Sequence, residues 1–236
     1  MAQTKQHQLA GVTELFRRSY ELVRENLNLF ILLYAVPALF AVWSSLSWFT
    51  DDKTTWTDER LSLSNWFGSF SGLNVETPAG LGAGLAFLLG ITAVIFGLLQ
   101  VILALRVSSG KKVELGDIWE EFKQKGFRLF LLEIALGILI LVGLVLLIIP
   151  GIILFWRLFL APFILLDKNT GVEEALRQSW RSTKGFAWPI YAVLLFGILL
   201  SLSGIIPFIG AIVSFVLGVA YACAPALRYW ELKKIG

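Results

Sequence analysis

Three polar residues lie inside long apolar stretches of the sequence, where their side chains could do chemistry. Gln100 and Glu133 each lie about 9 Å inside the basic end of their stretch at 1.5 Å per helical residue, so they could meet as a proton or cation site. A hydrogen bond between two helices is the interpretation we prefer for this pair. Arg157 could bind an anion or a lipid headgroup, or extend its guanidinium to the outer membrane surface, which its position favours.

Residue counts exclude several other kinds of chemistry. His7 is the single histidine and Cys223 the single cysteine, so a metal site built from several imidazoles or thiolates and an internal disulfide are both excluded. We find no nucleophile beside a base, no glycine-rich phosphate loop and no paired catalytic carboxylates. We therefore expect no enzyme activity, no cofactor and no metal. The net charge of +3 is small and divided among separate clusters, which argues against nucleic acid as a partner.

The elements that position these residues are predicted to be membrane-spanning helices. Hydrophobic residues make up 57% of the 236 positions and charged residues 16%, and the mean hydropathy is +0.75. About 20 apolar residues are needed to cross a bilayer as a helix. The sequence therefore predicts an all-α integral membrane protein with about six spans in a single domain, 1–236. The predicted elements are an interfacial helix at 12–25, spans at 27–49, 79–107, 127–149, 152–166, 186–204 and 209–230, and an external loop at 50–78.

The basic residues predict the orientation of these spans. Lys and Arg cluster in residues 1–26, 106–128, 167–185 and 228–236, whereas the alternate connections hold only Lys53 and Arg60. Basic connections remain on the cytoplasmic side of a membrane. We therefore expect both termini on the cytoplasmic side of a bacterial plasma membrane.

The sequence also repeats a basic corner followed by a proline turn. The first copy has Lys125, Gly126 and Phe127 before Pro150, and the second has Lys184, Gly185 and Phe186 before Pro207. Each copy follows an amphipathic, charged segment, so the repeating unit is predicted as a surface helix, a bend at glycine, a span, a proline turn and a returning span. The N-terminal part fits this unit loosely. The copies are predicted to superpose by rotation about an axis near the membrane normal.

A stripe of small residues follows the last predicted span with a spacing of four. It consists of Gly210, Ser214, Gly218 and Ala222. Small residues let two helix backbones approach closely in a membrane. We interpret the stripe as a packing surface, and we expect a bulky residue at Gly218 to destabilise the protein.

Motifs in the middle of the chain resemble those of a broad bacterial family. The resemblance covers mainly Lys125 to Trp188, and its motifs are moderately specific. They are Pro150-Gly151, Arg157, Ala161-Pro162, Glu174-Ala175-Leu176, Ser179-Trp180, Lys184-Gly185 and Trp188. This multi-pass family is named after the membrane domain of glycerophosphoryl diester phosphodiesterase and includes related membrane proteins of unknown function. The resemblance implies a multi-pass fold, and the chain lacks the acidic and histidine ligands of the phosphodiesterase barrel.

Two functions remain open from the sequence. The first is a non-enzymatic membrane protein that supports membrane or envelope lipid organisation, with amphipathic helices on the inner leaflet. Its expected partners are the lipid bilayer, anionic lipid headgroups or another membrane protein. The alternative is a transporter or channel for a lipid or small solute, with Gln100, Glu133 and Arg157 in its path. A polar cavity reaching mid-membrane would favour the alternative.

Overall fold

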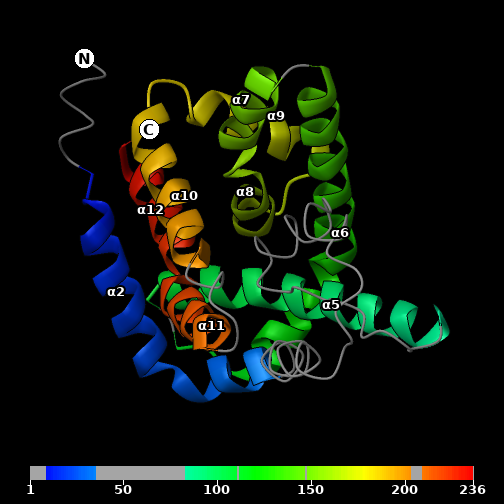
Figure 1. Cartoon of the computed structure of the whole chain (residues 1–236), viewed down its shortest axis with the longest axis vertical. Helices are drawn as coiled ribbons and strands as arrows, with labels where there is room; N and C mark the ends of the chain where they lie inside the picture. Colours follow the sequence, from blue (N-terminus) through cyan, green and yellow to red (C-terminus); the bar gives the residue numbers. More distant parts are fainter. Residues whose placement is uncertain (1–8, 36–82, 111, 147, 203–208, 236) are drawn as a thin grey trace.

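The computed structural model describes residues 9–35, 83–110, 112–146, 148–202 and 209–235, and within them the chain is all-helical (Figure 1). The helices are α2 (Val12–Glu25), α5 (Ala83–Ser108), α6 (Leu115–Leu146), α7 (Ile148–Leu158), α8 (Ala161–Lys168), α9 (Val172–Ser182), α10 (Ala187–Leu202), α11 (Ile209–Tyr221) and α12 (Ala224–Ile235). Residues 27–35 continue as helix after α2. The all-α part of the predicted fold class is therefore confirmed for the described residues.

Four stretches of the described residues are long and apolar enough to cross a membrane. They are Ile91–Ser108, Leu115–Leu146, Ile149–Lys168 and Ile212–Ile235. The pair formed by α9 and α10 gives a fifth if it is counted as one span, although it bends by 110°. Helix α10 alone has 16 residues, which is short for about 30 Å of hydrocarbon. The six predicted spans are thus not confirmed, and the rest of span 27–49 beyond residue 35 and the loop 50–78 lie outside the described residues.

Helix α6 is continuous where the repeat predicted a bend. Its buried positions run through Gly126 with a spacing of three to five, from Ile118 to Gly143. One apolar side therefore faces the protein along the whole helix, and the predicted separate surface helix before Gly126 is wrong. The glycine serves close packing instead, because a Cβ at this position would lie 2.9 Å from the ring of Phe122.

The second predicted corner is present. Gly185 has a φ of +89°, which glycine adopts without the steric cost that a side chain imposes. This conformation lies between α9 and α10, where the chain bends by 110°. The two corners of the predicted repeat therefore differ, one straight and one bent.

The directions of the helices also argue against the predicted rotation. In Figure 1, α6 rises from the level of α5 to the top of the view, whereas α10 descends. Parallel copies related by an axis along the spans would run the same way. Phe127 and Trp188 are both strongly exposed, as expected for interfacial positions. The repeat architecture as a whole is not confirmed, and Pro207 lies outside the described residues.

Helices α6 and α7 form a tight hairpin near the predicted turn. Pro150 lies in the first turn of α7, where a helix does not need its missing amide proton. The chains come so close that a Cβ on Gly143 would lie 2.9 Å from the Cα of Gly151. Two glycines facing each other therefore set the separation of these helices.

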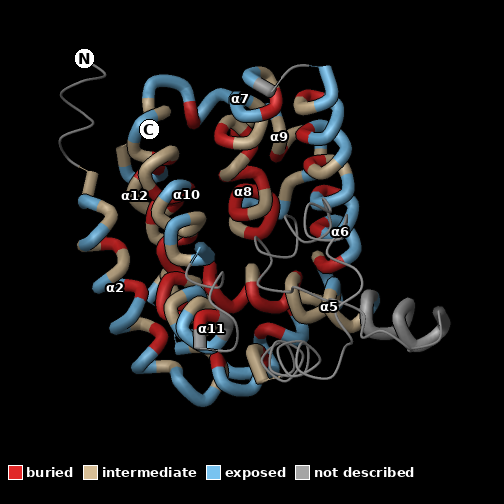
Figure 2. Tube along the Cα trace, viewed as in Figure 1, coloured by how far each residue is buried: buried red, intermediate tan, exposed pale blue. Residues whose placement is uncertain are grey.

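The core lies where α5, α8 and α12 meet. Leu103 of α5, Leu165 of α8 and Ala226 of α12 are almost completely buried and belong to one cluster. Figure 2 shows buried residues along these helices and exposed residues along the outer side of α6. The exposed residues of α6 include Ile138 and Val142. An apolar outer surface of this kind is what lipid-facing helices present.

The glycine contact in the hairpin gives a matched pair of substitutions within α6. Gly143→Ala places a methyl group against the backbone of Gly151 and should lower the thermal unfolding midpoint in detergent, at a cost of about 1–3 kcal/mol for overpacking. Gly137→Ala is the control, because a Cβ there meets no atom within 4 Å. Alanine also forms helix better than glycine, so the control should keep or raise the midpoint. Equal midpoints for the two variants would contradict the close approach.

Candidate functional site

Helices α11 and α12 together form one apolar stretch that is broken at residues 222–223. Pro225 lies in the first turn of α12 and cannot donate a helical hydrogen bond. The buried hydroxyl of Ser19, on α2, donates to the carbonyl of Ala220 at 2.7 Å and accepts from the amide of Cys223 at 3.1 Å. Ser108 donates to the carbonyl of Cys223 at 3.4 Å. Side chains from two other helices therefore satisfy the backbone at the break.

Helices α7 and α8 are broken in the same way at residues 159–160, just before Ala161-Pro162. The carbonyl oxygen of Arg157 accepts hydrogen bonds from Ser179 at 2.8 Å and from Thr183 at 3.2 Å. Both hydroxyls are fully buried. A second amphipathic helix thus supplies hydroxyls to a second broken stretch.

The helices that supply these serines share a sequence pattern. GVTELFRRSY at 11–20 and GVEEALRQSW at 171–180 have Gly, Val, Glu, Arg and Ser at equal spacing, followed by an aromatic residue. Both glycines are extended residues at the helix start, and the Glu pairs with the Arg in each copy. The sequence analysis missed this match, although it was visible without the structure. The repeated unit is a docking helix with a buried serine.

The docking explains how these amphipathic helices use their apolar faces. In α2, Leu15, Ser19 and Val23 are buried against the protein, so the expected placement of this face on the inner leaflet is wrong. The opposite face carries Glu14, whose pKa is held below its ordinary value by hydrogen bonds from Arg17 and then Arg18. The charged face is the one presented to the surroundings.

The guanidinium of Arg157 is held by two tryptophan side chains. Its central carbon lies 4.5 Å from the ring centre of Trp156 and 5.0 Å from that of Trp180. One terminal nitrogen donates to the carbonyl of Trp180 at 3.2 Å, while Nε is buried and has no hydrogen-bond partner among the described residues. The side chain therefore packs against α9 rather than extending freely.

The other two predicted polar residues, Gln100 and Glu133, do not form one site. Gln100 is buried and donates from Nε2 to the carbonyl of Leu33 at 3.3 Å. Glu133 is exposed on α6, on a face shared with Phe130 and Ile134. The structure brings neither of them to Arg157, and their predicted meeting is not found. The helix-to-helix hydrogen bond that we preferred is present for Gln100, with a different partner.

The small-residue stripe of α11 packs only in part. Gly210 is buried, and Ser214 donates to the carbonyl of Ser201 at 3.4 Å. Gly218 is exposed, and a Cβ there would meet no atom within 4 Å. Ala222 packs against the core. The predicted close backbone approach at Gly218 is therefore wrong for the described chain.

A charged cluster that the sequence analysis did not predict joins three helices. Glu121 is buried at 6% exposure and pairs with Arg106 of α5 and Lys125 of its own helix. Lys125 also donates to the carbonyl of Leu166 on α8 at 2.6 Å. An open cleft of about 340 Å³ lies beside this cluster. It is lined by Arg106, Lys112, Val113, Asp117, Glu120, Glu121, Gln124 and Lys125.

The cleft offers no recognisable catalytic set. Glu120 bonds to Lys123, and Glu121 bonds to Arg106 and Lys125. The third carboxylate of the cleft, Asp117, accepts a hydrogen bond from the backbone amide of Glu114. Among the residues that the structure describes, no group of three His, Cys, Asp or Glu could hold a metal ion. We assign the cluster a structural role in joining α5, α6 and α8.

Comparison with known proteins identifies a family for this chain. The model of the Uncharacterised protein family (UPF0259) matches residues 78–220. No curated protein and no solved structure matches the chain. The resemblance to the membrane domain of glycerophosphoryl diester phosphodiesterase is not confirmed, whereas an uncharacterised family agrees with the rest of that expectation.

The charged cluster can be tested with two adjacent carboxylates. Glu121→Gln leaves Arg106 and Lys125 without their counter-charge and should cost about 2 kcal/mol of stability, the scale of hydrogen bonds to charged groups. Glu120→Gln is the control, because its pair with Lys123 is exposed and such pairs contribute about 0–1 kcal/mol. Thermal unfolding in detergent measures both. A control as destabilised as Glu121→Gln would contradict the structural role.

Proposed function

The chain belongs to the Uncharacterised protein family (UPF0259), and we propose that it is a non-enzymatic multi-pass membrane protein that supports lipid organisation in the bacterial cytoplasmic membrane. The observation that carries this proposal is the apolar outer surface of its long helices. Val145, Leu146 and Ile149 at the α6–α7 hairpin are each more than 70% exposed. Contiguous apolar surfaces of this kind mark contact with a membrane or a partner.

The use of the interior polar groups supports a structural rather than a catalytic role. Ser19, Gln100 and Ser179 each bond to the backbone of another helix. Hydrogen bonds of this kind fix helices relative to one another in a membrane. Because these polar groups already bond to neighbouring helices, they do not line a polar path through the protein. This favours a closed scaffold over a transporter.

Exposed aromatic and basic side chains support a partnership with anionic lipid headgroups. Trp180 and Trp188 are exposed on either side of Lys184, and Trp119 is exposed near Lys123. Tryptophan and basic residues favour the headgroup level of a bilayer. The clustering of Lys and Arg in alternate connections of the sequence is the basis on which we propose that both termini lie on the cytoplasmic side.

One observation favours transport of a lipid or small solute as a second candidate. The α7–α8 and α11–α12 stretches are both broken within apolar sequence. Broken helices near the membrane centre form the binding sites of many transporters. Here the protein's own serines occupy the backbone groups at both breaks. For this reason we place the scaffold role first.

The two candidates can be distinguished in vesicles that contain the purified protein. With fluorescent phosphatidylglycerol in both leaflets, added dithionite should reduce only the outer-leaflet label, as in protein-free vesicles. Spin-labelled phosphatidylglycerol should be immobilised more than phosphatidylcholine, because exposed cations attract anionic lipid. Reduction of the inner label would show lipid transport, and equal immobilisation of both lipids would contradict the scaffold proposal.

A further inference from the structure

Arg157 carries a positive charge within the apolar stretch Ile149–Lys168. A charged side chain within an apolar stretch is costly to insert into a membrane, so it normally has a partner. No carboxylate of the described residues lies within 4.0 Å of its guanidinium, whereas the buried Arg228 pairs with Glu231. The charge of Arg157 is therefore not neutralised by the described part of the chain.

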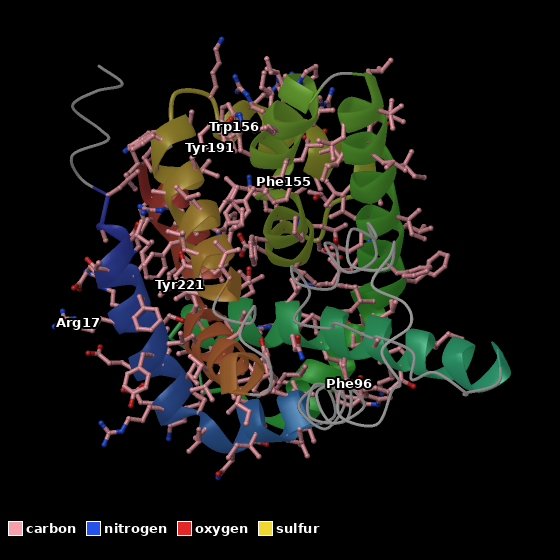
Figure 3. All side chains as sticks on the ribbon, in the orientation of Figure 1. Arg17, Phe96, Phe155, Trp156, Tyr191 and Tyr221 are labelled. Carbon is pink, nitrogen blue, oxygen red and sulfur yellow. The ribbon has the colours of Figure 1, made fainter. Side chains whose placement is uncertain are left out.

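The protein nevertheless holds this side chain in a defined place. Trp156 is buried and packs against Tyr191 with ring centres 5.5 Å apart, and Figure 3 shows both rings between α7 and α10. The guanidinium also lies over the ring of Trp180, which is 43% exposed. An indole ring attracts a cation that lies over its face. The guanidinium is therefore oriented without being neutralised.

Among the described residues, the guanidinium donates its hydrogen bond through Nη1, which leaves its Nε–Nη2 edge for a ligand. The backbone carbonyl of Trp180 accepts this hydrogen bond from Nη1 of Arg157. The backbone carbonyl of Arg157 accepts one from the hydroxyl of Ser179. Nε has no hydrogen-bond partner among the described residues although it is buried. A buried donor without a hydrogen-bond partner carries a desolvation cost. An acceptor along the Nε–Nη2 edge would remove this cost, with a shift of the exposed Trp180 ring giving access.

We propose that Arg157, held between Trp156 and Trp180, binds a phosphate group, which in the membrane is that of an anionic lipid headgroup. The planar guanidinium donates two parallel hydrogen bonds to a phosphate, a geometry that lysine cannot match. This inference rests on the proposed function, and it names the chemistry of one lipid site.

The test uses the full chain in neutral detergent. Thermal unfolding is followed while phosphatidylglycerol, phosphatidylcholine or inorganic phosphate is added. Phosphatidylglycerol should raise the midpoint of the wild type more than phosphatidylcholine does. Arg157→Gln should weaken the apparent affinity for phosphatidylglycerol tenfold or more. Arg181→Gln is the matched control and should bind like the wild type, because its side chain is exposed and lies outside the tryptophan pair.

Arg157→Lys keeps the proposal testable if Arg157→Gln does not fold. It retains the charge but loses the paired hydrogen bonds, so its affinity should still fall severalfold. Wild-type affinity in both Arg157 variants, or in whichever one folds, would overturn the site. An equal, Arg157-dependent effect of inorganic phosphate would support the site with free phosphate as its ligand. The scaffold proposal is tested separately, in vesicles that contain these variants. If they immobilise spin-labelled phosphatidylglycerol as the wild type does, the scaffold proposal stands even when the Arg157 site fails.

Discussion

The backbone groups at a broken helix need hydrogen-bond partners when apolar side chains surround them. Each unsatisfied group costs several kcal/mol in hydrocarbon, where water cannot replace the lost bond. Two apolar stretches of this protein are broken, and Ser19 and Ser179 bond to the backbone at those breaks. The backbone groups at the breaks therefore need α2 and α9 to dock against them. The positions of several other contacts follow from this docking.

The docking of α2 joins the two ends of the described chain. Ser19 contacts residues more than 200 positions away, and the buried Arg228 of α12 donates to the carbonyl of Ala10 at 2.9 Å. The docking of α9 has a different consequence, because it places Trp180 on the guanidinium of Arg157. The serine that bonds to the break and the tryptophan that contacts Arg157 are therefore adjacent residues of α9.

The sequence was sufficient for features that depend on local composition. Apolar length predicted the helices, and glycine at 185 predicted the bend before α10, because positive φ is a local property. The prediction of a bend failed at Gly126, where glycine instead permits close contact with the ring of Phe122 within a continuous helix. The partners of Gln100 and Ser19 also escaped prediction, since they depend on which distant helices pack together. The shared pattern at 11–20 and 171–180 was the available signal for α2 and α9.

Hydrogen exchange at the two breaks tests the account most directly. Backbone amides in 219–227 should exchange faster in Ser19→Ala, because the amide of Cys223 and the carbonyl of Ala220 lose their partner. Ser179→Ala should have this effect on 155–163 instead, because the carbonyl of Arg157 loses a donor. The exposed Ser182 provides the control variant Ser182→Ala, which should change neither segment. Unchanged exchange at both breaks in both variants would contradict the claim that the serines of α2 and α9 hold the broken helices.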